Sequence, residues 1–410
     1  ALTILVGALV LMLPVSAADG QITPFLDALF TAASASCVTG LVTVSTAVHW
    51  SVFGKCVILL LIQIGGLGFM SVAAIASFVL RRTITLHERM VMSAGLNLSD
   101  GGGIVRLTRR VLFGTFIIEG TGAVLLSCRF VPHYGFPKGI TMGVFHAVSA
   151  FCNAGFDLMG TPDDPFQSLI GWAEDPLVNI TVMALIVLGG LGFFVWSDVW
   201  DKHSFCRLRL HTKIVLTATA GLLLFGFGWT LLFEWSNPAT LGAFDTPHKL
   251  LAAAFESVTL RTAGFNTIDL GALTGPSQAV SCLLMFIGGS PGSTAGGIKT
   301  VTAAVLVLTA ISAFCGRTTV SAFGRTIAPR SIMNAVTLLM AGGVLCLVGA
   351  CAIAGIEDAP FHQCLFEAVS AFGTVGVSMG LTPTLAAASR VILIVMMYMG
   401  RVGVLTLGVA

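Results

Sequence analysis

The sequence predicts an all-α polytopic membrane protein made of four parallel helix–loop–helix repeats in a pseudo-fourfold arrangement around one axis, with eight spanning helices. Three observations support this fold class. The composition is strongly apolar, a short motif recurs at an almost constant spacing, and a glycine-rich motif recurs in the second helix of each repeat.

The composition excludes a water-soluble globular protein. Of the 410 residues, 56% are hydrophobic and only 10% are charged, whereas soluble domains carry roughly 25% charged residues. So little polar surface cannot cover a core of this size. The mean hydropathy is +0.95. The net charge of +2 is too small to indicate nucleic-acid binding. The chain is therefore expected to lie in a lipid bilayer.

The short motif recurs four times. Its glycines, Gly40, Gly155, Gly264 and Gly376, are 115, 109 and 112 residues apart. Each ends a segment that begins with phenylalanine, at 30–40, 145–155, 255–264 and 366–376. Such a period indicates internal repeats. These segments are too short to cross a bilayer, which needs about 20 residues, so re-entrant helices are expected.

Each repeat is expected to hold one apolar run before its short segment and one after it. The repeats are assigned to 1–80, 104–200, 211–315 and 330–410. In repeat order, the first apolar runs are the residues up to 16, then 104–128, 211–233 and 331–355. The second apolar runs are 52–80, 176–200, 276–315 and 389–410. The run at 2–15 is interpreted as a shortened first span rather than a signal peptide.

The second runs share a glycine motif. Gly65-Gly-Leu-Gly68 recurs as Gly189-Gly-Leu-Gly192, with related stretches at 288–292 and 400–403. Small residues allow close helix packing in lipid. Their recurrence also predicts that these helices line one common axis.

Charge predicts the orientation. The linkers 81–110, 198–213 and 316–330 hold 13 of the 21 lysines and arginines, so the positive-inside rule places them, and the N-terminus, in the cytoplasm. The four short segments then enter the membrane from outside.

Exposed main chain at the ends of the short segments predicts a cation site. Non-helical backbone at membrane depth is tolerated only where it is buried or lines a wet cavity, and rings of carbonyls can replace the water around a monovalent cation. The predicted ligands are Cys37, Val38, Thr39, Gly40, Cys152, Asn153, Ala154, Gly155, Thr262, Ala263, Gly264, Gly373, Thr374, Val375 and Gly376. No charged side chain recurs there, which disfavours Ca²⁺ and Mg²⁺. Glu256 and Glu367 are interpreted as outer-surface charges in the first turn of two short helices.

These four segments resemble the filter segments of the Trk/Ktr/HKT potassium transporters. The matching stretches are 38–41, 153–156, 261–266 and 373–376. The resemblance implies one potassium pore per chain, with potassium preference associated with glycine at all four positions and sodium with serine at the first. It also implies a multi-pass plasma-membrane protein of the bacterial inner-membrane type, most like the eight-span Ktr subunit.

A gate is expected below the filter. The second run of the third repeat contains Gly288, Gly289, Gly292, Gly296 and Gly297 with Pro291, and cannot form a continuous helix. It resembles the family's intramembrane loop, and Lys299 is assigned to its inner end. An incomplete match to a phosphate-binding loop at 292–300 is disfavoured, because Ile298 interrupts it.

Arg401 is the second gate residue. It follows Arg390 by 11 residues, about 16 Å along a helix, and so lies near mid-membrane, where a charge needs a partner. We expect it to donate hydrogen bonds to carbonyls between 288 and 297. A packing role near an interface is the alternative.

The resemblance also implies partners: a homodimer, and cytoplasmic nucleotide-binding regulatory subunits of the KtrA/TrkA type that dock on the basic inner face. Potassium is the only expected ion, with no organic cofactor and no nucleic acid.

Several alternatives stay open. A sodium- or proton-coupled symporter would use Glu119, which is otherwise a buried partner of another polar group, and a sodium-selective pore is the other rival. His146 and the ten cysteines are expected to be structural. No catalytic constellation is present in the sequence, so an enzyme is not expected.

Overall fold

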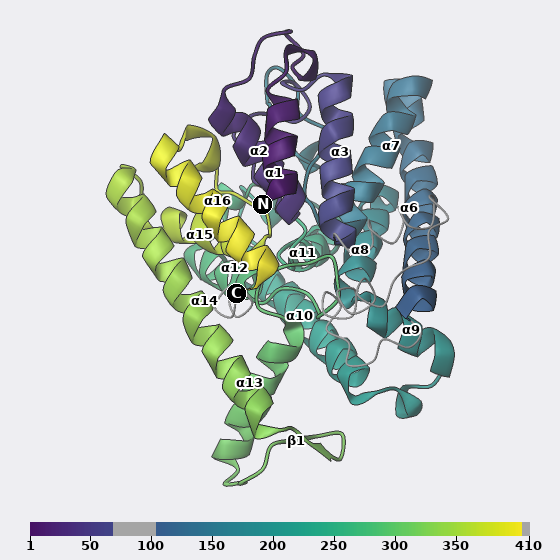
Figure 1. The fold of residues 1–410 in the computed structure, drawn as a ribbon, viewed down its shortest axis with the longest axis vertical. Helices are drawn as coiled ribbons and strands as arrows, with labels where there is room; N and C mark the ends of the chain where they lie inside the picture. The colour runs from purple at the N-terminus through teal and green to yellow at the C-terminus, as the bar shows by residue number, and fades with distance from the viewer. Residues whose placement is uncertain (69–103, 404–410) are drawn as a thin grey trace.

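The structure is a computed structural model that describes residues 1–68 and 104–403. The end of the expected run 52–80, most of the linker 81–110 and the end of the run 389–410 lie outside the described residues. The regular secondary structure of the described residues is almost entirely helical (Figure 1). Its α-helices are α1 (Leu2–Leu11), α2 (Phe25–Cys37), α3 (Val52–Leu67), α6 (Ile104–Tyr134), α7 (Phe136–Phe151), α8 (Pro176–Leu191), α9 (Phe193–Lys202), α10 (Leu210–Glu234), α11 (Thr246–Thr259), α12 (Gly275–Phe286), α13 (Thr300–Phe314), α14 (Pro329–Ile356), α15 (Phe361–Gly373) and α16 (Ala387–Val402).

Three helices of the described residues are long and apolar enough to cross a membrane. They are Arg109–Tyr134 within α6, Leu210–Glu234 and Pro329–Ile356. Helices α8 and α9 pass the same criterion only as a pair and are bent by 92°. The eight spans remain a prediction.

The apolar run 176–200 is divided between two helices, α8 and α9. Gly192 has φ +90°, which ends α8 and turns the chain into α9. The Phe193 amide then donates to the Gly292 carbonyl at 3.0 Å rather than to its own helix. The corresponding glycines, Gly68 and Gly403, also follow a helix end with positive φ. The last glycine of the motif therefore stops a helix, because its conformation is costly for other residues.

Four short helices, α2, α7, α11 and α15, carry the repeated motif. Each has a proline at or next to its start, where a missing amide hydrogen is tolerated. They begin earlier than the sequence indicated, so Glu256 and Glu367 do not lie in a first turn. These two side chains are 1% and 0% exposed, and their interpretation as outer-surface charges is wrong.

The helix contacts form a closed circuit. Each short helix packs against the helix before it, in the pairs α1–α2, α6–α7, α10–α11 and α14–α15. It also packs against a helix from another part of the chain, in the pairs α16–α2, α3–α7, α8–α11 and α12–α15. Figure 1 shows α16, at the end of the chain, beside α2, near its start, with α6 and α14 on opposite sides. The first and last segments are therefore neighbours.

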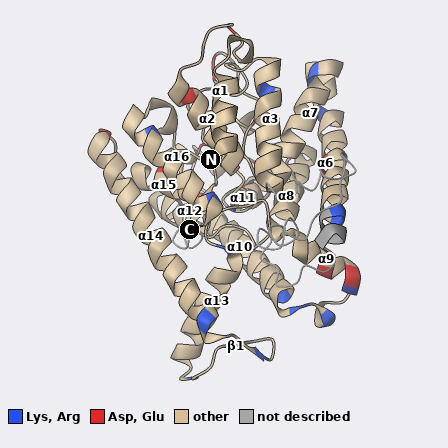
Figure 2. Ribbon diagram, viewed as in Figure 1, with Lys and Arg blue, Asp and Glu red and all other residues tan. Residues whose placement is uncertain are grey.

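Charged residues lie mainly near the two ends of the molecule, and its body is almost free of them (Figure 2). Lysines and arginines gather at the end that holds the start of α10 and the hairpin of β1 (Ser321–Ala322) and β2 (Arg325–Thr326). The basic linkers 198–213 and 316–330 thus share one end.

Glycines let three helices cross closely behind the short helices. A Cβ atom built on Gly65, Gly189 or Gly400 lies 2.2, 1.9 or 1.9 Å from the carbonyl oxygen of Ser36, Phe151 or Phe372, respectively. These distances are far below van der Waals contact, so the close approach depends on glycine.

We predict that Gly400→Ala lowers the free energy of unfolding by about 1–3 kcal/mol, because the added methyl group overpacks α16 against α15. Thermal unfolding of the purified protein measures it. Gly228→Ala in α10 is the control, since no heavy atom lies within 4 Å of its added Cβ; equal melting temperatures for both variants would contradict the packing argument.

Candidate ion-binding site

The chain leaves each short helix in the same unusual conformation. Val38, Asn153, Thr262 and Thr374, two residues before the four glycines, have φ between 51° and 64°. The glycines themselves have φ between 69° and 100°. Asparagine tolerates the left-handed region, but a β-branched residue there is an outlier. Strain of this kind, of order 1–3 kcal/mol per residue, concentrates at functional sites.

The four glycines form a ring of main-chain contacts. A Cβ atom built on Gly40 lies 2.6 Å from the Ala154 oxygen, and one on Gly155 lies 2.8 Å from the Ala263 oxygen. The ring continues with Gly264 and Val375 at 2.7 Å, and closes with Gly376 and Thr39 at 2.0 Å. Each glycine thus packs against the carbonyl that precedes the next glycine, and any side chain would force the segments apart.

Hydroxyl groups in the short helices hold the segments in place. Ser149 Oγ, Thr259 Oγ1 and Ser370 Oγ donate to the carbonyls of Phe156, Phe265 and Val377 at 2.6–2.7 Å. In the first segment, Ser34 Oγ instead accepts from the Gly40 amide at 3.0 Å. Sequence reasoning missed these four residues. The sequence could have identified them, because a serine or threonine lies four residues after each motif phenylalanine.

One cavity of about 240 Å³ is lined by all four glycines and by the residues that follow them; it is called the glycine cavity below. Asp157 and Asp269 also line it. Burial raises the pKa of the Asp157 carboxyl to about 6, although hydrogen bonds from the Met159 amide and from Ser168 oppose the shift. Asp157 and Asp269 thus give the cavity an acidic lining.

The apolar run 276–315 is interrupted, because α12 ends at Phe286 and α13 begins at Thr300. Loop 288–299 lies against the end of the fourth segment that follows α15, since a Cβ on Gly296 lies 2.2 Å from Thr374 Oγ1 and one on Gly297 lies 3.3 Å from Gly373 Cα. Gly292 packs against the Phe194 ring, at 2.7 Å from a built Cβ. Lys299 Nζ donates to the Ala295 carbonyl at 2.7 Å.

The expected hydrogen bond from Arg401 to this loop is confirmed. Its Nη1 donates to the Thr294 carbonyl, and its Nη2 donates to the carbonyls of Gly65 and Gly66. Thr294, which sequence reasoning missed, also donates from Oγ1 to the Phe151 carbonyl at 3.2 Å and to Asn153 Oδ1 at 3.3 Å. Thr294 and Arg401 therefore connect loop 288–299 to the second segment, to the end of α3 and to α16.

A second buried arginine holds the two ends of the loop. Arg261 Nη2 donates to the Gly288 carbonyl and to Thr300 Oγ1, both at 2.9 Å, and Thr300 Oγ1 donates to the same carbonyl at 2.9 Å. Arg261 is 7% exposed, and its Nε and Nη1 have no hydrogen-bond partner among the described residues. No periodicity marked this arginine, because the other three segments have no charge at that position.

The remaining candidates have structural partners. Glu119 accepts from Gln63 Nε2 at 3.1 and 3.2 Å and from Cys152 Sγ at 3.8 Å. His146 contacts the Met142 carbonyl at 2.7 Å through Nδ1 and accepts from the Leu158 amide at 3.2 Å through Nε2. The ten cysteines are free. The described residues contain no group of three or more His, Cys, Asp or Glu side chains suited to a metal ion.

Apolar helices long enough to span a bilayer around a ring of main-chain contacts are typical of a membrane transport protein. The sequence model of the TrkH family, described as cation transport protein, matches residues 5–410. The chain belongs to this family. It is a transport protein and not an enzyme.

The similar proteins are named as potassium and sodium transporters. The chain is 42% identical to the potassium/sodium uptake protein NtpJ of Enterococcus hirae over 407 residues, covering 98% of the chain and 89% of that protein. It is also 42% identical to the Ktr system potassium uptake protein B of Bacillus subtilis over 405 residues, covering 99% and 89%. The solved structure of the potassium transporter TrkH from Vibrio parahaemolyticus matches with a TM-score of 0.74 at 17% identity, covering 99% of the chain and 81% of that structure, and supports the fold.

We predict that Ser370→Ala lowers the free energy of unfolding by about 1–3 kcal/mol, because it leaves the buried Val377 carbonyl and Gly376 amide without the hydroxyl. Thermal unfolding of the purified variant measures this loss of stability. Thr337→Ala is the control, since that exposed hydroxyl bonds only within its own helix; no difference between the two variants would count against the role of the hydroxyl.

Proposed function

We propose that the chain takes up potassium across the plasma membrane through a selectivity filter of four main-chain segments, gated by loop 288–299. The observation that carries this proposal is the glycine cavity, because all four glycines line one space and their neighbouring carbonyls complete a ring. The 42% identity to a Ktr system potassium uptake protein B over nearly the whole chain supports potassium as the ion.

The chemistry of the ring favours a large monovalent cation. Its ligands are neutral carbonyl dipoles, which replace a loosely held water shell without the cost of neutralising carboxylates. Ca²⁺ and Mg²⁺ bind preferentially to carboxylate oxygens. Asp157 and Asp269, at the mouth of the ring, raise the local concentration of cations.

The proposed architecture has four parallel repeats, 1–80, 104–200, 211–315 and 330–410, with eight spans around one pore. The closed circuit of helix contacts supports it, because each short helix has the same two kinds of neighbour. The N-terminus and the basic linkers are proposed to be cytoplasmic, on the positive-inside rule.

Loop 288–299 is proposed to close the pore on its inner side. Thr294 and Arg401 connect the loop to the second segment and to the end of α3, and the Arg401 charge adds an electrostatic barrier to a cation. Opening requires these hydrogen bonds to break, while Arg261 keeps the two ends of the loop together.

Two other functions are distinguished by transport measurements. A sodium- or proton-coupled symporter would need an imposed Na⁺ or H⁺ gradient for rubidium uptake into liposomes, with Glu119 as its coupling residue. A sodium-selective pore would show that Na⁺ competes effectively against K⁺. The partners that we propose, a second copy of the chain and cytoplasmic nucleotide-binding subunits, follow from the family resemblance.

We predict that Gly264→Ser and Gly376→Ser each reduce the preference for K⁺ over Na⁺ roughly tenfold or more, because displacing one carbonyl costs about 1–2 kcal/mol of ion coordination. Rubidium and sodium flux in proteoliposomes measures this preference beside the parent protein. Gly324→Ser is the matched control, since Gly324 also has positive φ, no atom lies within 4 Å of its added Cβ, and it lies in the β1–β2 hairpin, away from the cavity. Selectivity unaffected by both filter substitutions would overturn the filter assignment.

We predict that Arg401→Ser raises cation flux severalfold, because it removes the hydrogen bonds that hold Thr294 and the positive charge beneath the filter. Potassium flux at equal protein density measures it, and Arg330→Gln, at an exposed position of α14, is the control. Unchanged flux from a folded Arg401→Ser protein would refute the gating role while leaving the filter assignment intact.

A further inference from the structure

A second cavity, of about 590 Å³, lies between the C-terminal end of α6 and the segment 159–176. This volume is within the range of small-molecule sites. Its walls are formed by Arg129, Pro132, His133, Tyr134, Met159, Gln167, Ser168, Gly171, Trp172, Glu174, Asp175 and Pro176. The transport mechanism uses none of the charged or aromatic residues in this wall.

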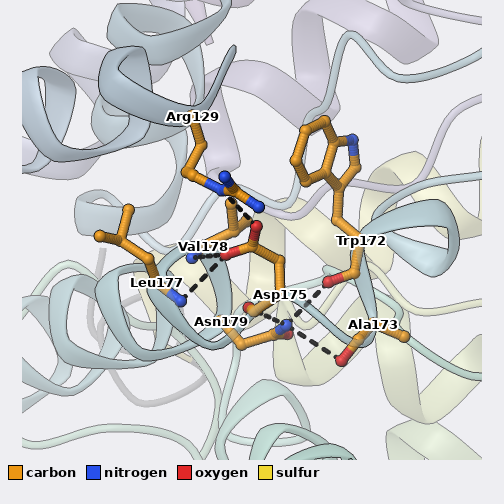
Figure 3. Close-up of polar contacts among 7 residues, drawn as sticks. All are labelled: Arg129, Trp172, Ala173, Asp175, Leu177, Val178 and Asn179. Atoms are coloured by element: carbon orange, nitrogen blue, oxygen red, sulfur yellow. Dashed lines mark hydrogen bonds and ion pairs between the residues drawn. The ribbon is translucent and has the colours of Figure 1, made fainter. Parts of the chain in front are cut away.

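Hydrogen bonds make one wall rigid (Figure 3). Asn179 Nδ2 donates to the carbonyls of Trp172, Ala173 and Asp175 at 2.7–3.1 Å, which fixes the turn before α8. Asp175 Oδ1 accepts from the Leu177 and Val178 amides at 3.0 and 3.1 Å and so caps that helix. A preformed wall lowers the entropy lost when a ligand binds.

Arg129 supplies a positive group on this wall. Its Nε donates to Asp175 Oδ2 at 2.5 Å, and its side chain remains 55% exposed. Its two Nη atoms have no hydrogen-bond partner in the part of the chain that the structure describes, and Figure 3 shows the end of the guanidinium group directed toward Trp172. Two free donors on one planar group match the oxygens of a phosphate.

The aromatic rings and the carboxylate of Glu174 in the same wall could bind an ammonium group next to a phosphate on Arg129. The Trp172 ring is held edge-on by Phe130 and His133 at centroid distances of 5.2 and 5.3 Å, and its Nε1 donates to Tyr134 Oη at 3.4 Å. Aromatic faces attract ammonium groups. Glu174 is exposed in the same wall, so the cavity has one arginine and two acids. This combination favours a ligand that carries one positive and one negative group.

We propose that this cavity binds a zwitterionic headgroup that carries a phosphate and a primary ammonium, as in phosphatidylethanolamine, with the phosphate on Arg129 and the ammonium between Trp172 and Glu174. The same helix exposes Phe113, Phe116, Ile117, Val124 and Leu125, an apolar surface suited to acyl chains. Tryptophan and tyrosine are typical of the membrane–water interface. The occupant contacts Ser168, which also lines the glycine cavity and accepts from the Asn266 amide at 3.1 Å.

The test is native mass spectrometry of the full chain in detergent, titrated with dioctanoyl phosphatidylethanolamine, dioctanoyl phosphatidylglycerol or soluble phosphoethanolamine. We expect the ethanolamine lipid to bind more tightly than the glycerol lipid, and Arg129→Gln to weaken it roughly tenfold, the effect of one lost charge-assisted contact. Glu174→Gln, at an exposed residue outside the capping network, is expected to weaken the ethanolamine lipid but not the glycerol lipid.

Arg110→Gln is the matched control, because Arg110 lies on the same helix and pairs with Asp201 at 3.1 Å, with both side chains 52% exposed. If soluble phosphoethanolamine binds as tightly as the ethanolamine lipid, the headgroup chemistry is supported and the ligand of this cavity is a soluble molecule. Equal binding of the two lipids, or undiminished binding in both Arg129→Gln and Glu174→Gln, would overturn the proposal.

Discussion

The approach of four peptide carbonyls to four glycines at the centre of the molecule is the constraint on which the other features depend. Each carbonyl lies where a Cβ atom of the neighbouring glycine would have to be, so the ring tolerates no side chain at these positions. The ring also requires left-handed residues before the glycines, including the β-branched Val38, Thr262 and Thr374. The surrounding hydroxyls offset part of this strain by satisfying the carbonyls beyond the ring.

Arginines hold main chain in place on one side of the ring, and Glu367 does so on the side of the glycine cavity. Glu367 accepts from the Thr382 hydroxyl at 2.6 Å and from the Met379 amide at 3.1 Å, and so fixes the loop after the fourth segment, which lines that cavity. Arg261 and Arg401 fix loop 288–299 through carbonyls. The position of Glu367 is occupied in the third segment by Glu256, whose two oxygens have no partner among the described residues. The four segments are thus similar in main chain and different in how their loops are held.

Patterns visible in the sequence were sufficient to predict much of this arrangement. The spacing of the four glycines and the glycine cluster at 288–297 predicted the short helices and the broken helix, and the depth of Arg401 predicted its hydrogen bond to the loop. Features with no such local pattern were not predictable in this way. Arg261 and Thr294 have no counterparts in the other segments, and their roles depend on contacts between distant parts of the chain. The bend at Gly192 was missed because glycine in an apolar run fits close packing and helix termination equally well. The burial of Glu256 and Glu367 was missed because the starts of their helices were placed too late.

The ring is completed by the two most distant segments, since Gly376 meets Thr39 and Gly40, and α16 packs against α2. The ribosome makes the first segment long before the last. Until α15 and α16 have entered the membrane, the Thr39 carbonyl lacks its neighbour, and the Gly65 and Gly66 carbonyls lack Arg401. Polar main chain facing lipid is costly, so an incomplete chain has a reason to stay beside the insertion machinery or to be degraded. Final folding is therefore tied to completed translation. Loss of the C-terminal helices would disturb the first segment as severely as the fourth.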